Sequence, residues 1–96
     1  MDLKETVIFK EKTSICWRKE NSVNLALFEA IKDHFERLIK EHIFTPLSSV
    51  LESLGIPVYK YEYYKIGWKV DDTFEFDWTK VNEDVYELYF GGMSEI

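Results

Sequence analysis

The chain has 96 residues, a mass of 11.5 kDa and a formal net charge of −6, and 46% of its residues are hydrophobic. This length suits one small domain, so we predict a single domain over residues 1–96. The composition excludes a disordered or collagen-like chain, and no run approaches the roughly 20 apolar residues that cross a bilayer. The one cysteine, Cys16, excludes an intramolecular disulfide and a cysteine-based zinc site.

The first ten residues, MDLKETVIFK, lack the basic segment and apolar stretch of a signal peptide. Together with the lone cysteine, they lead us to expect a cytoplasmic protein without membrane attachment. No linker rich in glycine, serine or proline divides the chain, and no internal repeat is present.

The predicted secondary structure begins with extended segments. Residues 6–10 are β-branched and aromatic, which predicts a strand, and residues 13–17 are a weaker, short candidate. The polar residues 18–22 predict a loop, in which Asn21 or Ser22 caps the first helix.

A first helix is predicted from about residue 23 to residue 42. Apolar side chains recur there every three or four positions, and the stripe consists of Leu27, Phe28, Ile31, Phe35, Leu38, Ile39 and His42. The opposite face is charged, and Asp33–Arg37 is one of its favourable pairs. His42, near the predicted C-terminus, suits a capping role.

A second helix carries clear signals at both ends. Thr45 suits the N-cap, and Pro46 suits the first helical position, where its missing N–H is not needed. A stripe of apolar residues follows at helical spacing and consists of Leu47, Val50, Leu51 and Leu54. Gly55 suits the left-handed position after the helix, and Pro57 prevents its continuation.

After Pro57 the apolar residues alternate with polar ones, which predicts strands. Residues 64–70 and 74–78 flank a turn at Asp71-Asp72, so they predict a hairpin. Residues 86–90 predict a third strand, which ends at Gly91-Gly92 before residues 93–96 fray. The predicted fold is α+β, with a short N-terminal strand and two helices packed on an antiparallel sheet of three to four strands.

Several short motifs follow one another along residues 7–90. They are residues 17–24 with Trp17 and Asn24, then Leu47-Ser48-Ser49-Val50, Leu54-Gly55-Ile56-Pro57, Ile66-Gly67-Trp68 and Phe76-Asp77. Their order and spacing resemble an uncharacterised family of small bacterial and phage proteins, in which Asn-Glu stands at the place of Ser48-Ser49. The resemblance implies a phage or mobile-element setting and carries no information about catalysis.

The negative charge is concentrated near the end of the chain. Residues 71–96 carry a net charge of −7, because eight acidic residues face the single base Lys80, while residues 1–70 carry +1. Glu75, Asp77 and Glu87 are predicted to share the solvent face of the sheet, and Asp71 and Asp72 extend the patch. The patch is interpreted either as a solubilising surface or as a docking face for a basic partner.

Tyrosines and lysines alternate in residues 59–65. If this segment is extended, Tyr59, Tyr61 and Tyr63 share one face. Such a face suits a protein contact, since tyrosine offers a large and rigid contact area. It also suits base stacking beside lysines that bind phosphate.

No pattern in the sequence indicates catalysis or metal binding. His34 and His42 are eight residues apart on one predicted helix, about 12 Å along its axis, so they cannot share a metal ion. Cys16 lacks a motif that would activate its thiol. Asp71 and Asp72 supply too few oxygens for calcium by themselves. We therefore predict a protein that is not an enzyme and holds no cofactor or metal.

The leading functional prediction is a non-enzymatic interaction protein of phage or mobile-element origin. It docks on another protein through the acidic or the tyrosine-rich surface, and an inhibitor that mimics nucleic acid is one version of it. Two alternatives stay open: a small module that binds single-stranded nucleic acid through residues 59–65, and a structural or assembly accessory of a phage. The net negative charge disfavours nucleic acid as a partner.

Overall fold

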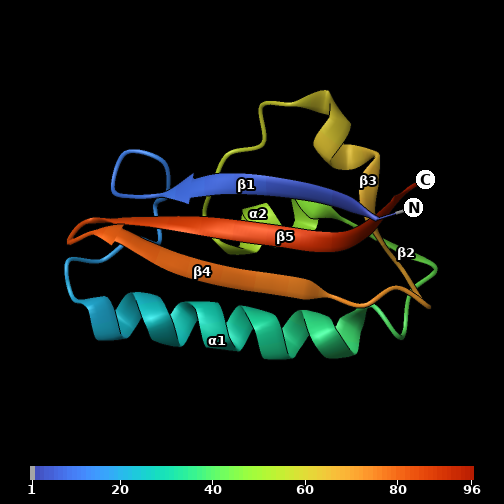
Figure 1. Cartoon of the computed structure of the whole chain (residues 1–96), viewed down its shortest axis with the longest axis horizontal. Helices are drawn as coiled ribbons and strands as arrows, with labels where there is room; N and C mark the ends of the chain where they lie inside the picture. The colour runs from blue at the N-terminus through green and yellow to red at the C-terminus, as the bar shows by residue number, and fades with distance from the viewer. Residues whose placement is uncertain (1) are drawn as a thin grey trace.

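In a computed structural model that describes residues 2–96, two α-helices pack against one face of a five-stranded antiparallel sheet (Figure 1). The elements in chain order are β1 (Leu3–Phe9), α1 (Asn21–Leu38), β2 (Phe44–Pro46), α2 (Leu47–Ser53), the short 3-10 helix η1 (Tyr61–Tyr64), β3 (Ile66–Lys69), β4 (Glu75–Asn82) and β5 (Val85–Glu95). The predicted α+β class is confirmed. Across the described residues the sheet has more strands than the expected three to four.

The central strand of the sheet is β5. One of its edges pairs with β1, while the other edge pairs first with β4 and then, at Ser94 and Glu95, with β3. β3 in turn pairs with β2. The hairpin predicted between residues 64–70 and 74–78 is therefore wrong, because within residues 2–96 both segments pair with β5 and not with each other. The chain does turn after β3, but this turn connects β3 to β4, and the two strands pair with different stretches of β5.

Two glycines lie inside β5 where its neighbour changes from β4 to β3. The sequence predicts that the strand ends at Gly91-Gly92 and that residues 93–96 fray, and this is wrong. Gly92 has a φ of +73°, and a Cβ there would collide with the carbonyl oxygen of Thr73. Glycine therefore lets the strand bend and continue, and Met93 beyond it is fully buried.

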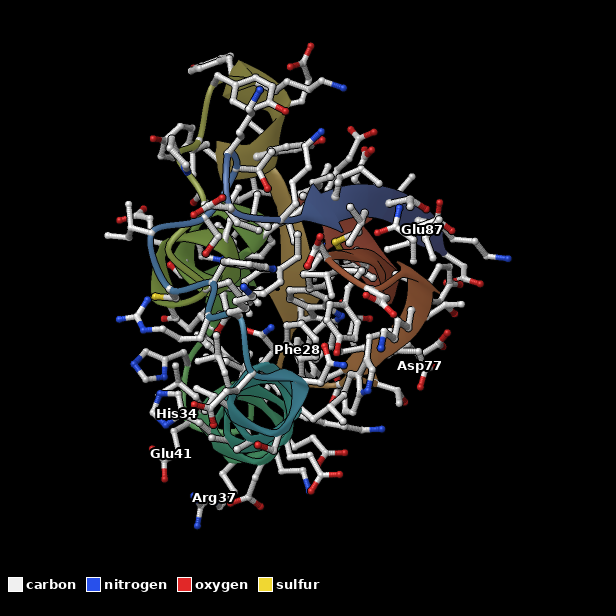
Figure 2. All side chains as sticks on the ribbon, turned by 90° about the vertical axis from the view of Figure 1, so that its left-hand side faces the viewer. Phe28, His34, Arg37, Glu41, Asp77 and Glu87 are labelled. Carbon is white, nitrogen blue, oxygen red and sulfur yellow. The ribbon has the colours of Figure 1, made fainter. Side chains whose placement is uncertain are left out.

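An aromatic cluster fills the space between α1 and the sheet. Phe28 of α1 lies edge-on to Phe9 of β1 and Tyr86 of β5, with ring centroids 4.9 and 5.2 Å apart, and Figure 2 shows it pointing into the interior. Phe76 and Phe90 stack with their centroids 5.0 Å apart. The second helix adds its whole predicted stripe to this core, namely Leu47, Val50, Leu51 and Leu54.

The first helix is shorter than predicted and begins without a side-chain cap. α1 ends at Leu38 rather than near residue 42, and it has no side-chain cap at its N-terminus, so neither Asn21 nor Ser22 plays the predicted role. Asn21 instead accepts a hydrogen bond from the Tyr86 hydroxyl at 2.9 Å. This end of the helix is therefore anchored on β5.

Two predictions about the charged face and end of α1 are confirmed. Asp33 and Arg37 form an ion pair with an N–O distance of 3.1 Å. Nδ1 of His42 lies 3.0 Å from the carbonyl oxygen of Leu38, so the exposed imidazole caps the end of the helix as predicted. In other respects His42 differs from the prediction, since it lies beyond the helix and outside the buried stripe.

The segment before α2 is a short strand, and the N-cap of α2 is Pro46, which was expected at the first helical position. Thr45, the predicted N-cap, lies in β2 opposite Trp68, and α2 begins at Leu47 directly after Pro46. Gly55 takes the predicted left-handed conformation with a φ of +73°, because the helix ends there.

Residues 13–17, the weaker strand candidate, form turns rather than a strand. The buried Ser14 hydroxyl donates to the carbonyl oxygen of Leu54 at 2.6 Å, and the Ile15 N–H donates to that of Gly55 at 3.1 Å. These bonds hold the loop after β1 against the end of α2, so it does not join the sheet.

Candidate interaction surface

Three carboxylates of β4 and β5 project from the sheet face opposite the helices. Glu75, Asp77 and Glu87 are exposed, while their neighbours Phe76 and Leu88 are buried against the helices. Figure 2 shows Asp77 and Glu87 on the side of the sheet that faces away from α1. The predicted shared orientation is therefore confirmed. We call this surface, formed by the exposed side chains of β4, β5 and β1, the outer face.

The strand register separates the three carboxylates of the outer face. Asp77 lies opposite Tyr89, and Glu87 lies between Thr79 of β4 and Ile8 of β1. Asp77 and Glu87 are therefore diagonal neighbours, which weakens their mutual repulsion compared with directly opposed acids. The half-buried Tyr89 sits among them, so the outer face combines an aromatic ring with negative charge.

Asp72, the second of the paired aspartates, does not extend this patch as expected. Asp72 forms the turn after β3, where its carboxylate accepts a hydrogen bond from the Lys69 N–H at 2.8 Å. It also lines a hollow beside the end of α1, together with Asp33 and Arg37. Asp72 is thus a turn residue next to the helix, while Asp71 is exposed in the same turn.

The tyrosine-rich segment is not extended, so its predicted single face is wrong. Tyr61 and Tyr63 belong to η1, in which residues two apart point in different directions. Tyr59 is 78% exposed and Tyr61 69%, but Tyr63 is only 5% exposed. Burial, and next the nearby Glu5 carboxylate, raise the pKa of Tyr63 to about 12. Tyr63 is therefore a core residue, and only Tyr59 and Tyr61 of the three predicted rings are exposed.

Two lysines cover the tyrosine rings in this segment. The Lys65 ammonium lies 4.8 Å from the centroid of the Tyr61 ring, and that of Lys60 lies 5.6 Å from the centroid of the Tyr63 ring. A stacked base would have to displace Lys65 from one face of Tyr61. The arrangement thus lacks the platform of three rings that base stacking would use.

The residues considered for chemistry lie apart from one another. His34 is exposed and packs edge-on against Phe35, with centroids 5.0 Å apart, and Figure 2 shows it near Arg37 and Glu41 on the helix surface. Cys16 is half-buried beside Gly55. Among residues 2–96 no group of three or more His, Cys, Asp or Glu residues is placed to hold a metal ion. Neither helix in this range has the length and apolarity needed to cross a membrane.

A basic hollow near the start of α1 is a feature that the sequence analysis missed. Lys10, Lys12 and Lys19 surround the indole of Trp17 in an open depression of about 540 Å³. The Trp17 indole N–H donates to the carbonyl oxygen of Asp84 at 3.0 Å, which joins the loop to the start of β5. The three lysines are close in sequence, but the net negative charge of the whole chain directed attention to the acidic residues and away from this basic cluster. Glu11 and Asp84 line the same hollow, so bases and acids are interleaved there.

No protein-family model matches this chain, and neither the curated proteins nor the solved structures contain a match.

Proposed function

We propose that this protein is a non-enzymatic binding protein that docks on a basic surface of another protein through its outer face. The observation that carries the proposal is the exposure of Glu75, Asp77 and Glu87 on a sheet face that, in the described part of the chain, neither helix covers. The same sheet buries its other face in the core, so the carboxylates are held by rigid strands.

The composition of the outer face suits protein recognition. Tyr89 is half-buried between the carboxylates, and Ile8 beside Glu87 is 37% exposed. Rigid aromatic and aliphatic side chains supply contact area, while the surrounding charges steer a partner of opposite sign and accelerate association. A cluster of acids without such anchors would serve solubility alone.

The chemistry of the partner follows from the charge. A basic surface that normally binds nucleic acid is one that an acidic sheet face can occupy, so an inhibitor that mimics nucleic acid is one version of the proposal. Two further expectations belong to the same proposal. One is a cytoplasmic location, and the other is the phage or mobile-element setting that the sequence resemblance implies. The alternative of single-stranded nucleic-acid binding through residues 59–65 loses support, because Tyr63 is buried and Lys65 covers Tyr61.

The test compares two variants with equal charge change. The first, Glu75→Gln with Asp77→Asn and Glu87→Gln, neutralises the outer face. The control, Glu20→Gln with Glu41→Gln and Glu52→Gln, neutralises three exposed acids on or next to the helices. Each protein is immobilised and used to capture partners from the lysate of the native host.

We expect a partner that wild type and control retain and that the outer-face variant loses. Its association rate with wild type should fall steeply with ionic strength, and the outer-face variant should flatten this dependence. Equal capture and equal salt slopes for all three proteins would refute the proposal.

A further inference from the structure

One edge of β1 is open. β1 pairs with β5 along its other edge, and within residues 2–96 no further strand pairs with it. An open edge presents unpaired N–H and C=O groups, and such a row is a template for another extended chain. The backbone groups of β1 that face this edge can be assigned from the hydrogen bonds of the following loop.

The Thr13 hydroxyl marks which backbone groups point outward. It donates to the carbonyl oxygen of Ile8 at 2.8 Å and accepts from the N–H of Lys10 at 3.0 Å, so these groups point away from β5. Because alternate residues of a strand direct their N–H and C=O to the same edge, the N–H of Ile8 and both groups of Thr6 point outward as well. Thr13 therefore closes one end of the edge and leaves its middle free.

A groove of about 290 Å³ runs beside this free stretch. Thr6 and Ile8 line one side, and Ile56, Pro57 and Tyr59 line the other. Tyr59, at 78% exposure, has no role in the core. The groove thus offers backbone hydrogen bonds on one wall and apolar contacts on the other, which is the pairing that strand addition uses.

The charge of the groove selects its occupant. Lys12 and Lys60 line it, and none of the described residues that line it is acidic, although the chain as a whole carries −6. Glu5 is half-buried against Tyr63, which itself lines the groove, so one carboxylate lies at the border of the lining. A second copy of the chain, paired through β1, would present its own Lys12 and Lys60 and no complementary acidic strand, so it does not match the charge of the groove.

We propose that this groove binds an extended acidic segment of another protein, which adds to β1 as a further strand of the sheet. Its backbone pairs with Thr6 and Ile8, alternate side chains contact Tyr59 and Pro57, and its carboxylates lie near Lys12 and Lys60. The groove adjoins the outer face, because Ile8 contributes to both, but its lysines take a partner of the opposite charge, so this site goes beyond the proposed function above.

The binding test uses a fluorescein-labelled peptide of about seven residues, the length of an ordinary strand, with alternating glutamate and valine. We expect saturable binding at low salt by fluorescence anisotropy, and no binding of the matching lysine–valine peptide. Lys12→Glu with Lys60→Glu should weaken binding about tenfold or more. The matched control, Lys40→Glu with Lys69→Glu, reverses two exposed lysines away from the groove and should bind as wild type does.

Amide hydrogen exchange tests the strand pairing without any variant. In the free protein the amides of Thr6 and Ile8 should exchange quickly, while those of Val7 and Phe9, which point toward β5, are protected. The acidic peptide should slow exchange at Thr6 and Ile8. Thr6→Pro should then weaken binding about tenfold, because it removes an outward donor and spares the bonds to β5.

Four results would overturn this inference. The first is that the acidic peptide does not bind, and the second is that both pairs of lysine substitutions weaken its binding equally. The third is that the peptide does not slow amide exchange at Thr6 and Ile8. The fourth is that a labelled oligothymidylate, or dimer formation through β1, displaces the peptide. The outer-face variant Glu75→Gln, Asp77→Asn, Glu87→Gln should bind the peptide as wild type does. Failure of this site and failure of the proposed function are therefore distinguishable.

Discussion

The indole Nε1 of Trp68 donates a hydrogen bond to the carbonyl oxygen of Gly91 at 2.9 Å inside the core. Trp68 lies in β3, and Gly91 lies in β5 just before the bend at Gly92. The strands β3 and β5 share only two register positions in the described structure, so this side-chain bond reinforces a short pairing. It holds β5 at the point where its partner strand changes from β4 to β3.

Removing this bond should destabilise the protein clearly. Trp68→Phe leaves the Gly91 carbonyl without its buried donor and also reduces the volume of a fully buried side chain. We expect the free energy of unfolding to fall by about 2–4 kcal/mol, measured by urea denaturation. Trp78→Phe, at a half-buried ring, should cost about 1 kcal/mol. Equal losses would show that the bond contributes little.

The two glycines of β5 should respond differently to alanine. At Gly92 a Cβ would meet the Thr73 backbone at a positive φ, so we expect Gly92→Ala to cost about 1–3 kcal/mol. At Gly91 a Cβ would lie 2.7 Å from the Tyr89 hydroxyl, a side-chain end that can move. The Tm from thermal unfolding should therefore be highest for wild type, lower for Gly91→Ala and lowest for Gly92→Ala. The reverse order would contradict this account of the bend.

The packing of α2 can be tested at its centre. Leu51 is completely buried, so Leu51→Ala should lower the free energy of unfolding by about 2–5 kcal/mol. Leu25 on α1 is 39% exposed and provides the control, since Leu25→Ala should cost much less. A denaturation midpoint that does not change in Leu51→Ala would mean that this helix face is not packed in solution.

Neutralising the outer face should not harm the fold. In the variant Glu75→Gln, Asp77→Asn, Glu87→Gln, repulsion between diagonal and neighbouring carboxylates is relieved, so stability should stay level or rise slightly. The wild type should gain stability from added salt, and the variant should gain less. A marked loss of stability would instead assign these carboxylates a structural role.

The buried tyrosine predicts a loss of stability at high pH. The pKa of Tyr63 is raised to about 12 in the folded protein from an ordinary value of 10.0, because burial disfavours the phenolate. The unfolded chain therefore releases this proton first, so the stabilisation is complete below pH 10 and is lost between pH 10 and about 12. Burial also raises the pKa of Tyr86, so it adds to the same loss.

Urea denaturation across this pH range, with tyrosinate absorbance, provides the measurement. Tyr63→Phe should lose less stability than wild type as the pH rises, while Tyr59→Phe, at an exposed ring, should follow wild type. A parallel decline in all three proteins would contradict the burial of Tyr63.

Local features of the fold follow from short-range patterns in the sequence. Alternation along residues 74–78 placed Phe76 toward the core and Asp77 toward solvent, because a strand directs successive side chains to opposite faces. The helical spacing of Phe28, Ile31 and Phe35 identified the buried side of α1 in the same way. The left-handed backbone of Gly55 was predictable because the residue just after a helix commonly adopts this conformation, which glycine favours.

Which segments meet depends on contacts that form only in the folded chain. The turn at Asp72 is encoded locally, but the pairing of β3 and β4 with β5 depends on contacts between residues far apart in sequence. Tyr63 was predicted to share a face with its neighbours, yet burial favours a 3-10 turn that places its ring in the core. The groove beside β1 exists because a loop from residues 56–63 lies along an unpaired strand edge, and no local pattern encodes that juxtaposition.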